Sequence, residues 1–306
     1  MWKKLGNIYS KHHAQVPVVI SLDEHWRIFY SDRIDGKSVP KYIDISKNCQ
    51  LINDNDNPIV SHGNRGTFDW AGVMPTAIVR PEPSIMFLYY IGWAIRKDVP
   101  YHNNLGLMIS KDGGKTFEKF SEGPVLSTSY KEPGYVGTIS VLLDNNIFKG
   151  WYLSCREWIE SKDGKFEPVY DIKYATSTNG IDWEPSGETC ISLEEDEGGI
   201  SQACVIKNSD VYHMWFSSRK KEDFRNNKKN SYRIKYASSK DGINWTRQKD
   251  LKFGLDISND GWDSDMVEYP CVVLENKDLY LFYNGNGFGK TGIGVAKWMN
   301  DIQLIF

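Results

Sequence analysis

The feature of this sequence that most constrains its fold is a repeat with a spacing of about 60 residues. Each copy begins with a short apolar segment and passes through a polar turn into a second, more strongly apolar segment. Repeats of this length are typical of architectures built from similar units in series. The five first segments are QVPVVI at Gln15, VMPTAIV at Val73, TISVLL at Thr138, SQACVI at Ser201 and EYPCVVL at Glu268.

A second recurring phrase predicts hairpin turns. SKDGGKTF begins at Ser110, STNGIDW at Ser177 and SKDGINW at Ser239, and each follows an apolar segment. Asp-Gly and Asn-Gly are strong hairpin signals because glycine tolerates a positive φ angle. We interpret each phrase as a structural turn between two strands, with its closing aromatic residue tucked beneath it.

Four strands per copy and five copies predict an all-β chain that folds as a five-bladed β-propeller with four-stranded antiparallel blades. The fifth copy lacks a fourth strand of the usual pattern, and WKKLGNIY at the N-terminus resembles the strand after Trp245. We therefore expect the N-terminal strand to close the ring. Residues 1–306 are expected to form a single propeller domain, because one blade cannot bury both of its faces alone.

Composition excludes several classes of function. A net charge of −3 gives no indication of nucleic-acid binding or of an anionic membrane surface. The five cysteines lack the spacing of a zinc site, so we expect neither a metal nor a cofactor. No segment resembles a signal peptide or membrane span, which predicts a cytoplasmic protein without membrane insertion. Abundant aromatic residues suit either a β-sheet core or stacking against sugar rings.

Polar residues follow the second apolar segment of every copy. The segments FYSDR, YLSCR and WFSSR end on Arg33, Arg156 and Arg219, and the corresponding positions of the second and fifth copies hold Trp93 and Asn286. In a propeller these strand ends meet at one face of the central channel, so the five side chains are expected around one pocket. Three guanidinium groups there favour an anionic ligand; alternatively, each arginine pairs with a carboxylate of a neighbouring blade.

The starts of the first strands converge on the same face. They carry candidate catalytic carboxylates at Asp69, Glu132 and Glu268, and candidate ligand-binding residues at His13, Gln202 and Asp265. Two carboxylates in a concave site with aromatic residues are typical of glycosidic-bond chemistry, where one acid protonates the leaving oxygen and another acts as base or nucleophile. The alternative for each carboxylate is a structural role beside an arginine or in a loop.

These strands and turns resemble the five-bladed propeller glycosidases, the superfamily of glycoside hydrolase families 32, 43, 68 and 130. The resemblance rests on YLFYNG, MWFSSR and the S-x-D-G-x-x-W turns, and covers nearly the whole chain. The phrases VPYHNNLGLMISKDGGKTF and DMVEYP also resemble a group of glycosidase-like bacterial proteins that are often encoded with surface-polysaccharide synthesis genes. The resemblance implies a sugar or oligosaccharide ligand.

The sequence departs from families 32 and 43 in one respect. Those families place an aspartate in the first strand of blade one, and KHHAQVPVV here contains no acid. By resemblance, Asp69 matches the blade-two acid and Glu132 the blade-three acid. The basic residues are similar to the phosphate-binding set of family 130 and equally suit an acidic sugar; they are His13, Arg33, His102, Arg156 and Arg219. SKDGGKTF also fits the Asp-box of sialidases, although the Arg-Ile-Pro start of that family is missing.

Together these features predict an enzyme that cleaves or transfers a glycosidic bond of an acidic sugar in surface-polysaccharide metabolism. The negative charge of the ligand follows from the arginines, which donate hydrogen bonds and cannot accept them from sugar hydroxyls. Two alternatives stay open, a carbohydrate-binding propeller without catalysis and a phosphorylase or glycosyltransferase that uses phosphate or a nucleotide sugar. A protein-interaction propeller is disfavoured because the WD signature is missing.

Overall fold

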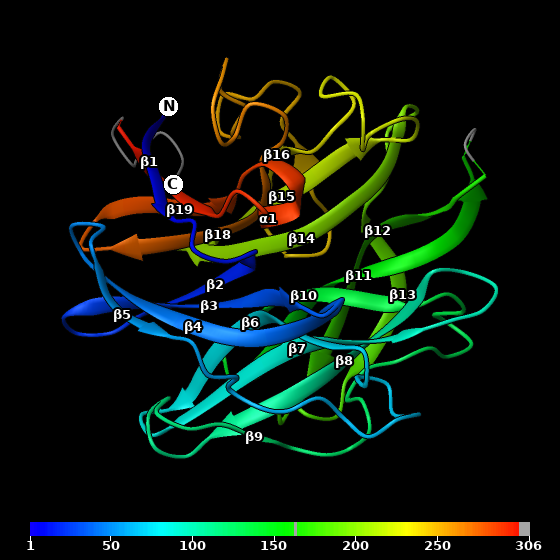
Figure 1. Cartoon of the computed structure of the whole chain (residues 1–306), viewed down its shortest axis with the longest axis horizontal. Coiled ribbons are helices and arrows are strands. Elements are labelled where there is room, and N and C mark those ends of the chain that lie inside the picture. The colour runs from blue at the N-terminus through cyan, green and yellow to red at the C-terminus, as the bar shows by residue number, and fades with distance from the viewer. Residues whose placement is uncertain (162–163, 300–306) are drawn as a thin grey trace.

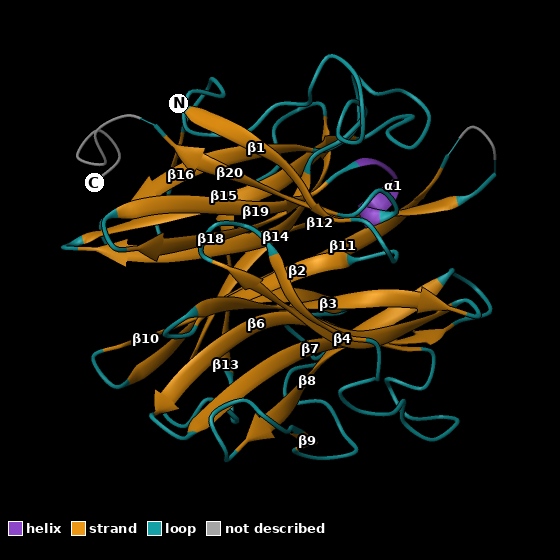
Figure 2. Cartoon of the chain, turned by 60° about the vertical axis from the view of Figure 1, so that its left-hand side comes forward, coloured by secondary structure: helices purple, strands orange, loops and turns teal. Residues whose placement is uncertain are grey.

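The computed structural model describes residues 1–161 and 164–299, and strands dominate that part of the chain (Figure 2). The element labelled α1 (Asn286–Gly289) is a single turn in which Gly287 and Phe288 have positive φ angles. The all-β prediction is therefore confirmed. Glycine adopts the left-handed conformation without strain, whereas Phe288 is held there by its surroundings.

The strands form antiparallel units of four, which the chain completes one after another. The first unit contains β2 (Gln15–Ser21), β3 (His25–Ile34), β4 (Lys37–Ser46) and β5 (Leu51–Asn55). The second contains β6 (Gly72–Glu82), β7 (Ile85–Ile95), β8 (Tyr101–Ser110) and β9 (Glu118–Lys119). The third contains β10 (Val136–Asp144), β11 (Ile147–Glu160), β12 (Phe166–Ser177) and β13 (Glu184–Ile191). The fourth contains β14 (Glu197–Asn208), β15 (Val211–Lys220), β16 (Arg233–Ser239) and β17 (Thr246–Arg247). The last contains β18 (Glu268–Glu275), β19 (Asp278–Asn284), β20 (Ile293–Trp298) and β1 (Trp2–Tyr9).

Neighbouring units are joined in two ways. Single parallel pairs, Ser38 with Gly72 and Tyr170 with Gly199, connect the first unit to the second and the third to the fourth, which gives two eight-stranded sheets. The first strands β2, β6, β10, β14 and β18 also contact one another in that order, and β18 contacts β2. The N-terminal strand β1 lies beside the C-terminal strands and pairs antiparallel with β20 (Figures 1 and 2).

Each Asp-Gly or Asn-Gly turn lies within one unit and is hydrogen-bonded to the preceding unit. In each turn the serine hydroxyl accepts a backbone hydrogen bond, as between Ser239 Oγ and the Gly242 N–H at 2.9 Å. The glycine carbonyl then accepts from the second strand of the preceding unit, and the Trp151 indole donates to Gly242 at 2.6 Å. Arg27 and Tyr89 make the equivalent bonds to Gly114 and Gly180. The turns are thus structural, as predicted, and they also join neighbouring units.

All five first strands contain a β-bulge at the same level. The register shifts directly after Gln15, Val136, Ser201 and Glu268, which pair with equivalent residues of the second strands, and in the second unit it shifts one residue later, after Pro75. A bulge sets two residues against one and turns the next side chain out of the regular alternation. Three of the bulged residues, Val16, Gln202 and Tyr269, have positive φ angles, which cost energy for non-glycine residues. Residues at several of these irregularities line a cavity.

Candidate functional site

A cavity of about 390 Å³ opens where the bulged first strands meet the loops that precede them. Its volume lies near the lower end of the ~300–1,000 Å³ range of small-molecule sites. Residues at the bulges form part of its lining: Gln15, Gly137, Thr138, Ser201, Glu268 and Tyr269. Aromatic side chains form much of its wall: Trp93, Tyr101, Tyr135, Tyr170, Phe224, Tyr232 and Phe288. The cavity therefore combines polar groups with flat apolar surfaces, as a sugar ring requires.

Glu268 is the central ionisable group of this cavity. Its side chain is 1% exposed, Oε1 lies 3.5 Å from the Ser201 hydroxyl, and Oε2 has no hydrogen-bond partner among the described residues. Burial raises the pKa of Glu268 to about 8, against the opposing effects of a Tyr269 hydrogen bond and of the charges on Arg225 and Arg219. The carboxyl group is therefore mostly protonated at neutral pH, which is the state of a general acid.

A second buried oxygen in the cavity is available to a ligand. Gln15 is buried at the equivalent position of the first unit, and its Oε1 accepts no hydrogen bond from the described residues. Buried polar atoms are normally paired, because an unsatisfied one costs about 1–3 kcal/mol. Gln15 Oε1 and Glu268 Oε2 thus provide two polar contacts for hydroxyl groups of a ligand.

Arg33 gives the cavity a positive charge. Its guanidinium lies 5.4 Å from the centre of the Trp93 ring, and no carboxylate among the described residues forms an ion pair with it. His13 lies nearby and donates from Nε2 to the Phe288 carbonyl at 2.9 Å. Burial lowers the pKa of His13, and the charge of Arg33 adds to this effect although the bond to Phe288 opposes it. His13 is therefore neutral at pH 7, with Nδ1 available as an acceptor, and Arg33 carries the charge.

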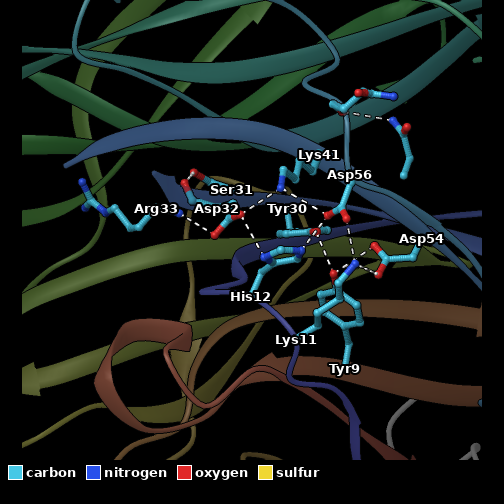
Figure 3. A network of polar contacts seen from close by, with 12 residues as sticks. Tyr9, Lys11, His12, Tyr30, Ser31, Asp32, Arg33, Lys41, Asp54 and Asp56 are labelled. Atoms are coloured by element: carbon cyan, nitrogen blue, oxygen red, sulfur yellow. Dashed lines mark hydrogen bonds and ion pairs between the residues drawn. The ribbon is translucent and has the colours of Figure 1, made fainter. Parts of the chain in front are cut away.

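A polar network fixes the backbone beside these two residues (Figure 3). Asp32 accepts from the backbone N–H of Arg33 at 2.7 Å, from His12 at 3.2 Å and from the buried Lys41 at 3.0 Å. Because His12 and Asp32 each precede a cavity residue, this network fixes the loop before β2, which presents His13, and the strand β3, which presents Arg33. Within the described residues, His12, Asp54 and Asp56 also form a cluster of metal-ligand type. The ammonium groups of Lys11 and Lys41 already contact these aspartates, so the cluster acts as an ion-pair network.

Sequence reasoning missed a second carboxylate of the cavity, Glu167 on β12. Arg225 binds it in bidentate fashion, with Nε at 2.6 Å from Oε1 and Nη2 at 2.8 Å from Oε2. Paired in this way, Glu167 neutralises Arg225 and leaves Arg33 as the unpaired cation of the lining. Glu167 lies at the start of a third strand and Arg225 in a loop, whereas the prediction considered only the ends of second strands and the starts of first strands.

The structure places the other two predicted catalytic residues outside the lining of this cavity. Asp69 is buried and accepts from the Lys119 ammonium at 2.6 Å and from the Tyr90 hydroxyl at 3.1 Å. Glu132 is also buried and is bound by the hydroxyls of Tyr152 and Ser154 and the ammonium of Lys173. Both carboxylates have the structural surroundings that the sequence left open as their alternative role.

The three arginines occupy equivalent backbone positions, but their side chains lie in different surroundings. Each comes two residues after the strand residue that faces the bulge: Ser31, Ser154 and Ser217. A second bulge in β11, between Cys155 and Glu157, turns Arg156 outwards; its side chain is 52% exposed and forms an ion pair with Asp171 at 3.1 Å. Arg219 is 1% exposed and lies behind the cavity wall, where it donates to the Pro168 carbonyl and stacks on Phe224. Of the three, Arg33 alone lines the cavity.

Four of the remaining predicted residues, Gln202, Asn286, Asp265 and His102, lie outside the lining of the cavity. Gln202 reaches across from β14 to β6, where its amide exchanges hydrogen bonds with Thr76. The Asn286 side chain accepts from the backbone N–H of Asp265 and so fixes the loop before β18, while Asp265 itself is exposed. His102 lies on β8 with its ring 6.3 Å from that of Tyr135, a residue of the wall. Trp93, by contrast, lines the cavity as predicted for a ligand-binding residue.

Comparison with solved structures defines the class of the fold. The chain superposes on a complex of BT0996 and RGII with a TM-score of 0.75 and 18% identity, over 97% of this chain and 91% of the other. A thermostable family-43 glycoside hydrolase superposes with a TM-score of 0.68 and 13% identity, over 94% of this chain and 91% of the hydrolase. The chain also superposes on a family-32 β-fructofuranosidase of Bombyx mori, a mutant in complex with sucrose. The TM-score is 0.63 with 13% identity, over 94% of this chain and 61% of the other. The fold is therefore that of the β-propeller glycoside hydrolases, which confirms the predicted resemblance.

Sequence comparison identifies the family. Two proteins of Mycobacterium tuberculosis, named "Uncharacterized protein MT1551" in strain CDC 1551 / Oshkosh and "Uncharacterized protein Rv1502" in strain ATCC 25618 / H37Rv, are each 34% identical to the chain over 309 residues. The alignments cover 96% of this chain and 98% of theirs. The chain belongs to the family of these two proteins. No family model matches it, and no helix in the described residues has the length and apolarity to cross a bilayer.

Proposed function

We propose that this protein is a carbohydrate-active enzyme that cleaves or transfers a glycosidic bond of an acidic sugar, in the metabolism of a bacterial surface polysaccharide. The observation that carries the proposal is Glu268, a buried carboxyl group that is protonated at neutral pH and has a free oxygen in an aromatic cavity. The comparisons support the fold on which such an enzyme is built. The reaction and its substrate are our inference from the site.

In the proposed reaction Glu268 gives its proton to the glycosidic oxygen while the bond between that oxygen and the anomeric carbon breaks. Water attacks the anomeric carbon, and the proton that it loses restores the Glu268 carboxyl group. An acid that stays protonated at pH 7 suits this role, because an alkoxide leaving group needs a proton as the bond breaks. In this reading Asp69 and Glu132 stabilise the surrounding loops and do not touch the substrate.

The acidic character of the substrate is inferred from Arg33. Arg33 lines the cavity, is exposed, and has no ion-pair partner among the described residues, so a carboxylate or phosphate of the ligand would form a bidentate contact with it. Trp93 lies beside the same group and offers a flat face to a sugar ring. Gln15 Oε1 would then accept from a sugar hydroxyl.

We also propose that the five four-stranded units are the blades of a single propeller domain closed by the N-terminal strand. The pairing of β1 with β20 and the contact of β18 with β2 support this arrangement. In such a ring the bulges of all five first strands lie around one channel. That placement accounts for a cavity lined by residues from distant parts of the sequence.

A phosphorylase is the second candidate, and one observation favours it. The only other carboxylate of the described lining, Glu167, is engaged by Arg225, so no free carboxylate is left to activate water. A phosphorylase needs no such base, because phosphate itself attacks the anomeric carbon while Glu268 protonates the leaving oxygen. Arg33 would in that case bind the phosphate.

Assays of disaccharide cleavage test both candidates. The acidic substrates carry glucuronic, galacturonic or N-acetylneuraminic acid at the non-reducing end, and the neutral ones are galactosyl and glucosyl disaccharides. We expect the protein to cleave an acidic disaccharide only. Glu268→Gln should lower kcat by about 100-fold or more. Arg33→Gln should raise KM by about tenfold or more. Arg65→Gln, the same change at an exposed arginine, is the control. Dependence on phosphate with a glycosyl phosphate product would identify the phosphorylase. Equal cleavage of neutral disaccharides, or full activity of Glu268→Gln, would refute the proposal.

A further inference from the structure

A second hollow lies directly outside the cavity. This outer groove has a volume of about 750 Å³ and lies between the adjoining ends of β11 and β12 and the loop that follows β15. Glu167, Phe224 and Arg225 line both the cavity and the outer groove. The three residues therefore form a wall shared by the two spaces, and the charge of Arg225 acts on Glu268 inside the cavity.

The wall is rigid and flat. Arg225 is bound to Glu167 at two points and lies over two rings, 4.8 Å from the centre of Phe224 and 5.2 Å from that of Phe288. Phe224 is buried by Tyr232 and by Arg219, whose guanidinium lies 3.9 Å from the ring centre. The Arg225 side chain is 44% exposed but held at two points, so it loses less entropy than a free side chain when a ligand contacts it.

The chemistry of the outer groove differs from that of the cavity. The cavity contains an unpaired guanidinium, whereas the outer groove mixes donors and acceptors of both signs with amides and an aliphatic side chain: Ile159, Glu160, Lys221, Asp223, Asn226 and Asn230. Neutral sugars carry hydroxyl groups that need donors and acceptors in alternation, and arginine alone cannot supply both. The outer groove thus suits neutral sugar residues, and the cavity suits an acidic one.

We propose that the outer groove binds the neutral part of a glycan whose acidic terminal sugar occupies the cavity, with the Glu167–Arg225 pair as the boundary between the two subsites. This inference rests on the proposed function, and it assigns the substrate class as a neutral chain capped by an acidic sugar. The linkage between cap and chain then passes over the wall next to Glu268. An enzyme of this geometry removes or adds one sugar at the end of a chain and does not cut within it.

The experiment compares chain lengths in the inactive Glu268→Gln protein, so that binding is measured without turnover. The probes are free glucuronic, galacturonic and N-acetylneuraminic acid, and the same acids as caps on neutral galactosyl chains of increasing length. Isothermal calorimetry with the preferred acid should show affinity that rises about tenfold from the free acid to the capped chain, as one or two added hydrogen bonds would give. The variant Asn226→Trp fills the outer groove and should abolish this gain without weakening binding of the free acid.

The matched control is Asn57→Trp, the same change at an exposed loop position that lines neither space. It should keep the full dependence on chain length. If affinity does not rise with length, or if Asn226→Trp leaves the rise intact, the outer groove is not a sugar subsite although the proposed function stands. If no acidic sugar binds in any form, the proposed function fails and this inference fails with it.

Discussion

The raised pKa of Glu268 predicts an unusual dependence of protein stability on pH. In the unfolded chain this carboxyl group has its ordinary pKa of 4.5, and in the folded protein burial raises it to about 8. Between these values the folded state binds more protons than the unfolded state, so the free energy of unfolding falls as pH rises. The stabilising contribution is complete below pH 4.5 and is lost above pH 8.

The magnitude follows from the two pKa values. At 1.36 kcal/mol per pKa unit, the difference between 4.5 and about 8 corresponds to about 5 kcal/mol. Glu268→Gln keeps the shape of the side chain and removes the titration. The difference between the variant and the wild type should be within about 1 kcal/mol near pH 5, where the folded Glu268 is neutral. At pH 9 the variant should exceed the free energy of unfolding of the wild type by about 4–5 kcal/mol.

Urea unfolding of both proteins at pH 5, 7 and 9 measures this difference. Glu195→Gln, the same substitution at an exposed position, controls for effects of the change itself and should track the wild type at every pH. A wild-type-to-variant difference that changes by less than about 1 kcal/mol between pH 5 and 9 lies within the error of the extrapolation. That result would show that Glu268 is not buried as a neutral acid and would remove the main support for its role as proton donor.

Two further predictions concern the fold. Ser239→Ala removes the acceptor of the Gly242 N–H in a buried turn and should lower the free energy of unfolding by about 1–2 kcal/mol in urea, whereas the exposed Ser192→Ala should not. Deletion of residues 1–9 removes Trp2 from its core cluster, which alone costs about 3–5 kcal/mol, and uncovers the edge of β20. The shortened chain should melt at a lower temperature and self-associate in size-exclusion chromatography; an unchanged melting temperature would show that β1 is dispensable.

The sequence predicted the elements of this fold well because they follow from local chemistry. Alternating and continuous apolar segments marked the strands, and the Asp-Gly and Asn-Gly pairs marked the hairpins. The sequence also indicated the convergence of strand ends, since a repeat of antiparallel units brings equivalent positions to one face. His13, Arg33, Trp93 and Glu268 were chosen on that basis, and the structure brings all four to one cavity.

The roles of the other candidates depended on contacts that no local pattern encodes. Asp69 and Lys119 are 50 positions apart, and their ion pair is set by how β9 lies against the loop before β6. Glu167 and Arg225 come from a strand and a loop outside the repeat positions, so equivalence between copies could not identify them. The hydrogen bond from Trp151 to Gly242 could not be predicted either, because it joins two units at positions that are not equivalent in the repeat.

The arginines show how a repeat produces an asymmetric site. Equivalence in sequence fixes where the Cα atom lies in each unit, but the direction of the side chain depends on the local register. One additional bulge in β11 turns Arg156 towards solvent, and a tyrosine and a phenylalanine beside Arg219 hold that side chain behind the wall. Arg33 has neither feature, so it alone keeps the inward direction that the repeat predicted. A site built from repeated strands therefore gains its specificity from the units that depart from the repeat. Glu268 is one such departure, because it is the single acid at a position where the other copies have Gln, Met, Val and Ser.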